Sequence, residues 1–378
     1  MKYLLLSFLF TITFNQAFAG WSDASIRVFE SFKSPQYSDA GFFALWGGVQ
    51  RTLKKESLDG DDLEWEFPLL KEKLKIYLRT STSQLKRPLV IVFPGIYGNH
   101  RGQVTPIVLN HLEESDYHIA SLPNFLNHWY VKAAPQYSDQ NFSQLDRDVA
   151  FYFIEKLVDT IGASRISQVT LIGESLGAFL AVSLGEKYKR LKSFNGVKLK
   201  NLILMWPPLN LAKSLNAFDH GIETANRVYK NCSYLNFLWQ AFDGFFVTKS
   251  PEVFSSEAQK CFSALMYNKA FMRSVSKSFD EMEDSDEVAE PENFNQFFKL
   301  YNPNFLKVLG DKKNLFISKL RSWSATSVNV KIISSLDDFI NEPNDWKEIK
   351  EAYLFEKGSH SGLLAYEFWG PILRSEVE

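Results

Sequence analysis

Short apolar runs, separated by longer segments of helical periodicity, recur along most of the chain. Residues 89–93 are continuously apolar and rich in β-branched side chains, which is typical of a central strand covered on both faces. Residues 168–173 and 199–206 repeat this pattern and also predict buried strands. Further strands, half-buried or weaker in pattern, are predicted at 73–79, 117–122, 328–334 and 352–355.

Helices are predicted between these strands, because apolar residues there recur at three- and four-residue spacing. The clearest lie at 145–161 and 176–189, with further helices near 345–351 and after Gly362. Residues 20–72 carry amphipathic helical patches and little chemistry. Strands that alternate with helices predict a mostly parallel sheet with helices on both faces.

The alternation of strands and helices disappears between Pro207 and about Ser324. This stretch is rich in aromatic residues, is mostly helical in pattern, and includes an acidic run at 280–292 that we expect to be a solvated loop. We therefore predict a large, mainly helical cap inserted into an α/β core. The predicted boundaries are 20–206 for the first part of the core, 207–324 for the cap and 325–378 for the second part of the core.

The N-terminal residues have the pattern of a secretory signal peptide. Lys2 precedes a largely apolar run at 3–14, and the tripeptide Ala-Phe-Ala at 17–19 offers a cleavage site before Gly20. The apolar run is shorter than the roughly 20 residues that a membrane-spanning helix needs. We predict that residues 1–19 are removed and that the mature protein is exported, periplasmic or secreted, with no stable membrane span.

Composition narrows the possible partners. The chain has 378 residues, of which 45% are hydrophobic, enough for a large core. Its formal net charge of −2 gives no basic field to attract nucleic acid, so no nucleic-acid partner is expected. Cys232 and Cys261 show no zinc-binding spacing, and no metal or cofactor is predicted. After export these two cysteines can form a disulfide, but two separate buried thiols are equally compatible with the sequence.

The strongest chemical signal is the pentapeptide GESLG at 173–177, a G-x-S-x-G motif. It follows a predicted buried strand and opens a helix of small and apolar residues. Such a strand–turn–helix bend holds the serine in a strained conformation, and its glycines are needed because the chain crowds itself there. We predict Ser175 as a nucleophile and the backbone N–H of Leu176, at the helix N-terminus, as a donor to an oxyanion.

A serine hydroxyl needs a base, and that base needs an acid to orient it. His360 lies in the segment GSHSG, just after a predicted strand, and is the predicted base. The segment SSLDDFI at 334–340 follows another predicted strand and offers two candidates for the acid, Asp337 and Asp338. Both aspartates remain possible on this evidence.

A second oxyanion donor is expected from the loop PGIYG at 94–98, which follows the central strand. Gly95 permits a tight turn there, and we assign the donor to the backbone N–H of Ile96. His100 and Arg101 lie close to this loop, where they either touch a polar substrate group or belong to the surface. Asn124, after the strand at 117–122, is a candidate for lining a pocket.

The segments FPGIYGN, GESLG, SSLDDFI and GSHSG occur in this order, and in them the chain resembles the serine esterase and lipase branch of the α/β-hydrolase superfamily. The resemblance covers about residues 70–206 and 325–378. It implies the chain order Ser, Asp, His and favours Asp337 over Asp338, since an acid followed three residues on by an aliphatic residue is usual in that fold. The loop begins Pro94-Gly95 where the family usually has His-Gly, and in the 207–324 stretch we recognise no cap of that family.

The expected function is therefore hydrolysis of a carboxylic ester, in which a small-molecule or lipid acyl ester is the substrate and no cofactor is needed. An acyltransferase or a peptidase would use the same three side chains. A binding protein that keeps this fold without turnover is the alternative from another functional class.

Overall fold

The computed structural model describes most of the α/β part of the chain and several shorter segments. The described residues are 27–29, 59–96, 98–102, 104–112, 115–134, 142–228, 291, 293–301, 309, 315–336, 338, 340–341, 343–349, 352–355, 360 and 369–377.

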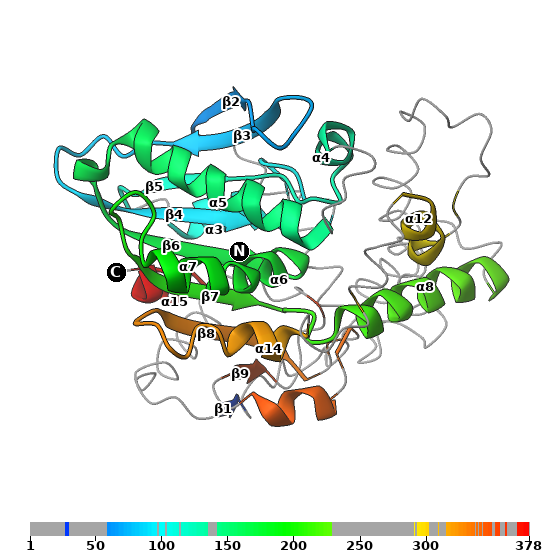
Figure 1. The fold of residues 1–378 in the computed structure, drawn as a ribbon. Coiled ribbons are helices and arrows are strands. Elements are labelled where there is room, and N and C mark those ends of the chain that lie inside the picture. Colours follow the sequence, from blue (N-terminus) through cyan, green and yellow to red (C-terminus); the bar gives the residue numbers. More distant parts are fainter. Residues whose placement is uncertain are drawn as a thin grey trace, which may run out of the picture.

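The described strands form one sheet in the order β1-β9-β8-β7-β6-β4-β5-β3-β2 (Figure 1). Among them, β3 pairs antiparallel with both β2 and β5, and all the other neighbours are parallel. The strands are β1 (Arg27–Phe29), β2 (Asp61–Trp65), β3 (Leu74–Arg79), β4 (Arg87–Phe93), β5 (His118–Ser121), β6 (Ile166–Glu174), β7 (Leu199–Met205), β8 (Asn329–Ser335) and β9 (Ala352–Phe355).

The strand order identifies the architecture. Counted along the chain from β2 to β9, the strands lie in the sheet as first, second, fourth, third and then fifth to eighth. This is the order of the α/β-hydrolase fold, so the predicted fold class is confirmed. Two edge strands were missed, because β1 and β2 fall in the segment expected to carry helical patches. The sequence of β2, DDLEW, is mostly exposed and has too few apolar positions to show the alternation of a strand.

Helices cover both faces of the sheet, as predicted. On β4, Leu89, Ile91 and Phe93 belong to one buried cluster, whereas Val90 and Val92 belong to another. Successive side chains of a strand point to opposite faces, so the two clusters are the two faces of the sheet.

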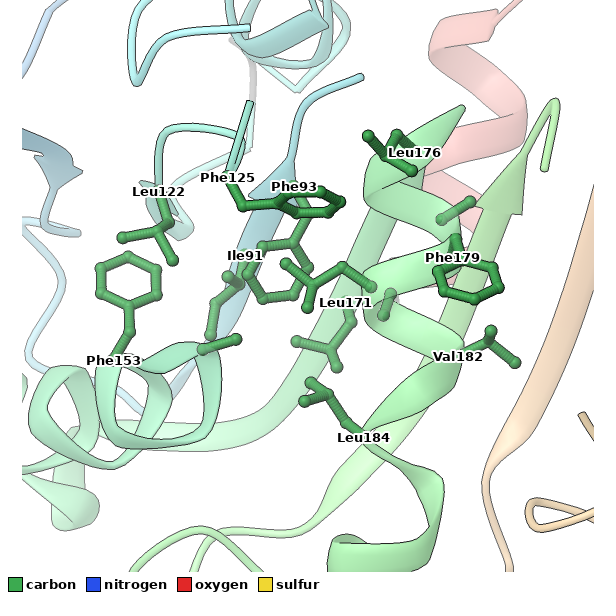
Figure 2. Packing of buried hydrophobic residues seen from close by; sticks show 14 of the residues in the cluster. Ile91, Phe93, Leu122, Phe125, Phe153, Leu171, Leu176, Phe179, Val182 and Leu184 are labelled. Atoms are coloured by element: carbon green, nitrogen blue, oxygen red, sulfur yellow. The ribbon is translucent and has the colours of Figure 1, made fainter. Parts of the chain in front are cut away.

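The larger cluster includes residues of α5 (Phe142–Ile161), α6 (Leu176–Ser183), α7 (Gly185–Leu191) and α14 (Phe316–Leu320). Figure 2 shows part of it, with Ile91 and Leu171 on the strands and Val182 on α6. The other cluster includes residues of α3 (Val104–His111) and α15 (Trp369–Val377).

Between β7 and β8 the described elements are helices, namely α8 (Leu211–Val228), α12 (Phe294–Tyr301) and α14. Figure 1 shows α8 and α12 beside the sheet rather than over either face. They are joined by Asp219 on α8, whose carboxylate accepts from the backbone N–H groups of Phe294, at 2.8 Å, and Asn295, at 2.9 Å.

The end of this stretch packs on the core. The indole N–H of Trp323 donates to the Val182 carbonyl on α6 at 2.8 Å, and its ring stacks on Tyr188 of α7.

The division into core and cap stays a prediction. The signal peptide at 1–19, both cysteines, and all of the acidic run at 280–292 except Pro291 lie outside the described residues. Among the helices that are described, none is both long and apolar enough to cross a bilayer.

The carboxyl group of Asp146 is buried in the core, and the hydrogen-bond partner that the described residues give it is neutral. Asp146 on α5 is 3% exposed and accepts a hydrogen bond from the Tyr130 hydroxyl on α4 (His128–Ala133) at 3.0 Å. Burial raises the pKa of the Asp146 carboxyl well above its ordinary value of 3.8, because desolvation disfavours the charged form.

This buried acid predicts a pH-dependent stability. The pKa of this carboxyl is higher in the folded protein than in the unfolded chain. Its contribution to the free energy of unfolding is therefore fully present below the unfolded-state pKa and is lost as the pH rises through the folded-state pKa. Asp146→Asn keeps an acceptor for Tyr130 and removes the ionisation. Above the ordinary pKa of an aspartate, the variant should become more stable relative to the wild type as the pH rises, by up to about 1.4 kcal/mol per pH unit while the folded carboxyl stays protonated. Urea unfolding at several pH values measures this gap, and parallel stability curves for the two proteins would contradict the prediction.

Candidate active site

Ser175 occupies a strained turn between β6 and α6. Its φ is 53° and its ψ is −120°, and a positive φ is uncommon for a residue other than glycine. Its backbone N–H donates to the Met205 carbonyl at the end of β7, at 2.8 Å. The side chain is therefore presented at the carboxyl end of the central strands, on the strand–turn–helix bend that the GESLG motif predicts.

Two glycines make this turn possible. A Cβ on Gly173 would lie 2.6 Å from the Gly177 carbonyl oxygen and from the Ala178 Cα atom. A Cβ on Gly177 would collide with the carbonyl group of Phe93 at the end of β4. The start of α6 therefore presses directly against the end of β4, and this close approach places Ser175 beside the loop that follows β4.

The structure brings His360 to this serine. The Nε2 atom of His360 lies 2.8 Å from the Ser175 hydroxyl oxygen, and its Nδ1 atom lies 3.1 and 3.2 Å from the two carboxylate oxygens of Asp338. An ionised carboxylate only accepts hydrogen bonds, so Nδ1 carries the proton and Nε2 is left to accept from the hydroxyl. The three residues follow β6, β8 and β9, whose carboxyl ends meet at one edge of the sheet.

Asp338 is held by a set of hydrogen bonds besides the one to His360. Its side chain is completely buried, and a buried charge is costly unless its oxygens find donors. The backbone N–H of Ile340 donates to Oδ1 at 3.1 Å, and the Ser334 hydroxyl and the Asn341 amide donate to Oδ2 at 3.3 and 3.2 Å. These donors fix the direction in which the carboxylate faces the ring.

The carboxylate at the ring is thus Asp338, the alternative acid from the sequence. Asp337, which the family resemblance favours, lies outside the described residues. That preference rested on Ile340 as an aliphatic residue three positions on. In the structure Ile340 contributes its backbone N–H to Asp338, so the spacing that matters here is two residues.

The loop after β4 is anchored beside the nucleophile. A Cβ on Gly95 would lie 3.1 Å from the Ser175 Cβ atom, and the backbone N–H of Gly95 donates to the buried Glu174 carboxylate at 2.7 Å. Asn124 holds both ends of the loop. Its side-chain amide donates to the Pro94 carbonyl at 2.9 Å, and its backbone N–H donates to the Gly98 carbonyl at 2.8 Å.

These contacts bear on the expected oxyanion donors. Because the N–H of Gly95 already binds Glu174, the next described N–H in the loop is that of Ile96, which is half-buried. Leu176 is the first residue of α6, where a backbone N–H has no acceptor within the helix. Both assigned groups therefore lie in segments that flank Ser175.

His100 and Arg101 are occupied by an acidic partner. The His100 Nε2 atom lies 3.1 Å from a carboxylate oxygen of Asp62, and the Arg101 guanidinium contacts the same carboxylate and the Gly60 carbonyl. Burial lowers the pKa of His100, because desolvation disfavours the charged imidazole. These contacts give both side chains a structural role, and His100 is buried rather than at the surface.

Three polar residues at the site were not assigned these roles from the sequence. Glu174 stood in the variable position of GESLG, and Asn124 was expected to line a pocket rather than to hold the Pro94–Gly98 loop. Asn341 gave no signal. Glu174 and Asn124 bind partners distant in the chain, and Asn341 joins the nearby Asp338 to the distant Pro207 and Leu209, so no local pattern predicts these roles.

The described residues contain no group of three or more His, Cys, Asp or Glu side chains arranged to hold a metal ion. A surface pocket does open near α5, away from the segments that carry Ser175, Asp338 and His360. It is lined by Phe67, Pro68, Leu69, Asp148, Val149, Tyr152, Glu155 and Lys187.

The strand order and the strained serine turn define the α/β-hydrolase fold. Here the serine contacts one ring nitrogen of a histidine, and the other ring nitrogen of that histidine contacts an aspartate. No protein-family model matches the chain, and no curated protein matches it.

Solved structures that resemble it include several hydrolases. One is an esterase from Pyrococcus furiosus, with 12% identity, 84% of this chain and 90% of that chain covered, and a TM-score of 0.48. A serine hydrolase from Cycloclasticus zankles has 15% identity and a TM-score of 0.46, and the match covers 84% of this chain and 96% of that chain. The thioesterase domain of the curacin biosynthetic pathway has 13% identity and a TM-score of 0.44, and the match covers 84% of this chain and 99% of that chain. At such low identity these likenesses concern the fold alone.

The anchoring of the loop after β4 leads to a prediction about Asn124. Asn124→Ala removes the side-chain bond to the Pro94 carbonyl, so the N–H of Ile96 should lose its fixed direction. The kcat for p-nitrophenyl ester hydrolysis should fall by about 10- to 100-fold with little change in KM, because a misplaced oxyanion donor is felt mainly in the transition state.

Asn127 offers a matched control in the same segment. Its side chain accepts from the backbone N–H of Trp129 at 3.2 Å and caps α4, and Asn127→Ser keeps a capping oxygen. Steady-state kinetics should show the loss of kcat in the Asn124 variant only. Equal kinetics for the two variants would argue against a role for Asn124 in the oxyanion loop.

Proposed function

We propose that this protein is a serine hydrolase that cleaves carboxylic esters, with Ser175 as nucleophile, His360 as general base and Asp338 as the orienting acid. The contact that carries the proposal is the 2.8 Å distance between the Ser175 hydroxyl and His360 Nε2. Three features support it: the strained turn at Ser175, the buried carboxylate behind the imidazole, and the anchored loop beside the serine.

The reaction follows from these positions. Ser175 Oγ attacks the acyl carbonyl carbon while its proton passes to His360 Nε2. The tetrahedral intermediate collapses, the bond to the leaving alcohol breaks, and the imidazolium gives its proton to that alcohol. A water molecule then gives a proton to Nε2 and attacks the acyl carbon. The bond from that carbon to Ser175 Oγ breaks, the imidazolium returns its proton to Oγ, and the carboxylic acid leaves.

Asp338 remains ionised throughout this cycle. Its role is to hold the proton of His360 on Nδ1 and to stabilise the imidazolium that forms in each half-reaction. We assign the acid to Asp338 rather than Asp337, because the Asp338 oxygens lie 3.1 and 3.2 Å from Nδ1. Two aspartates cannot both occupy this single position at the ring.

The negative oxygen of the tetrahedral intermediate needs preorganised donors. We propose the backbone N–H groups of Ile96 and Leu176 for this role. Support comes from the bond between Gly95 and Glu174, which leaves Ile96 as the next donor of the loop, and from the place of Leu176 at the start of α6.

The proposed substrate is a small-molecule or lipid acyl ester, and the chemistry requires no cofactor. We also propose that the protein acts outside the cytoplasm, in the periplasm or as a secreted enzyme. The support for this location is the signal-peptide pattern at residues 1–19, with Lys2 before the apolar run and the Ala-Phe-Ala site after it.

Replacement of the proposed nucleophile tests the function. Ser175→Ala removes the attacking oxygen, and kcat for a p-nitrophenyl ester should fall by about 10⁶-fold, towards the residual rate that binding and the oxyanion donors alone provide. The measurement is steady-state hydrolysis by the purified mature protein.

Ser183 on the same helix provides the control. Its hydroxyl donates to the Phe179 carbonyl within α6 at 2.6 Å. Ser183→Ala should keep kcat close to that of the wild type, because this hydroxyl bonds the helix backbone and none of the proposed reacting groups. Hydrolysis that survives in Ser175→Ala at the wild-type rate would overturn the proposal.

A further inference from the structure

Asn341 uses its whole side-chain amide in the loop that carries Asp338. Its Nδ2 group donates to Asp338 Oδ2 at 3.2 Å and to the Pro207 carbonyl at 3.0 Å. Its Oδ1 atom accepts from the backbone N–H of Leu209 at 2.9 Å. The residue is 7% exposed, so these bonds form with little competition from water.

Two of these bonds reach the connection from β7 to α8. Pro207 and Leu209 lie on this connection, which leads into the predicted cap. The start of α8 makes further contacts with the same loop region, because the Ser214 hydroxyl donates to the Ile340 carbonyl at 3.0 Å and the Lys213 ammonium lies 3.2 Å from the Asp345 carboxylate. The connection from β7 and the first turn of α8 are thus bonded at several points to the loop that carries Asp338.

Asn341 differs from these other contacts because its bonds include the reactive carboxylate. The oxygens of Asp338 lie at nearly equal distances from His360 Nδ1, so the ring alone does not select one rotation of the carboxylate. Without Asn341, the Ser334 hydroxyl, at 3.3 Å, would be the side-chain donor to Oδ2 that remains among the described residues. Together with the Ile340 N–H on Oδ1, the Asn341 amide on Oδ2 therefore holds the carboxylate in one rotation.

We propose that Asn341 is a positioning residue for the reaction. It fixes the rotation of the Asp338 carboxylate, and this carboxylate orients the His360 ring towards Ser175. Because Asn341 also bonds the connection from β7 to α8, the rotation depends on the position of that connection. The inference rests on the proposed function and extends it, because it links the acid of the catalytic group to the root of the predicted cap.

The test compares Asn341→Ala with Ser214→Ala. Asn341→Ala removes the bond to Asp338 together with the two bonds to the β7–α8 connection. Ser214→Ala removes a bond between α8 and the Ile340 carbonyl and leaves the Asp338 carboxylate untouched. A merely structural role for Asn341 predicts similar behaviour of the two variants at equal loss of thermal stability.

Two readouts distinguish positioning from structure. In Asn341→Ala, kcat for a p-nitrophenyl ester should fall by about 10- to 100-fold with KM nearly unchanged, because a small misalignment of the base acts on the chemical step. The low-field proton resonance of His360 Nδ1–H, identified by its loss in His360→Ala, should shift or broaden. Ser214→Ala should keep both kcat and this resonance.

Asn341→Ser is a second variant in case the alanine protein does not fold, since a serine is too short to bond Asp338 and Pro207 together. It should show the same fall in kcat. An unmoved resonance with wild-type kcat in a folded variant overturns the proposal, and so does an equal loss in Ser214→Ala. If the wild type hydrolyses no ester, the proposed function fails, and the resonance by itself still decides whether Asn341 orients the pair.

Discussion

The close packing of α6 against the end of β4 is the constraint on which the rest of this site depends. Without a side chain, Gly177 lets the first turn of α6 lie against the Phe93 carbonyl. This contact holds Ser175 at positive φ and sets it beside the loop that begins at Pro94. Asp338 and His360 follow parallel strands, and the carboxyl ends of these strands lie at the same edge of the sheet as Ser175.

Polar side chains hold the loops at this edge in place. Glu174 and Asn124 fix the segment after β4, whereas Asn341 and the N–H of Ile340 fix the carboxylate of Asp338. Each of these groups is buried, and a buried polar group that loses its partner is costly. The same bonds that stabilise the loops therefore restrict them to one arrangement, which is what a preorganised site requires.

The sequence predicts the frame of this structure better than its details. Continuous apolar runs locate β4, β6 and β7, and GESLG locates the serine turn because the motif and its strand–helix context are local. The sequence pattern does not predict the edge strands β1 and β2, because β1 is short and β2 is largely polar. The acid is ambiguous because Asp337 and Asp338 are adjacent and identical in type, and only the position of His360 in space separates them. Asn124 binds a partner far along the chain, and Asn341 joins the nearby Asp338 to the distant Pro207 and Leu209, so neither role gives a periodic signal in the sequence.

The central claim is that Ser175 is made reactive by His360 and Asp338. A fluorophosphonate probe tests this without any knowledge of the natural substrate. Peptide mapping by mass spectrometry should place the adduct on Ser175, and the labelling rate should fall by about 10⁴-fold in Asp338→Asn while Asp337→Asn labels like the wild type. An adduct on another residue, or a slow Asp337 variant beside a fast Asp338 variant, would contradict the account.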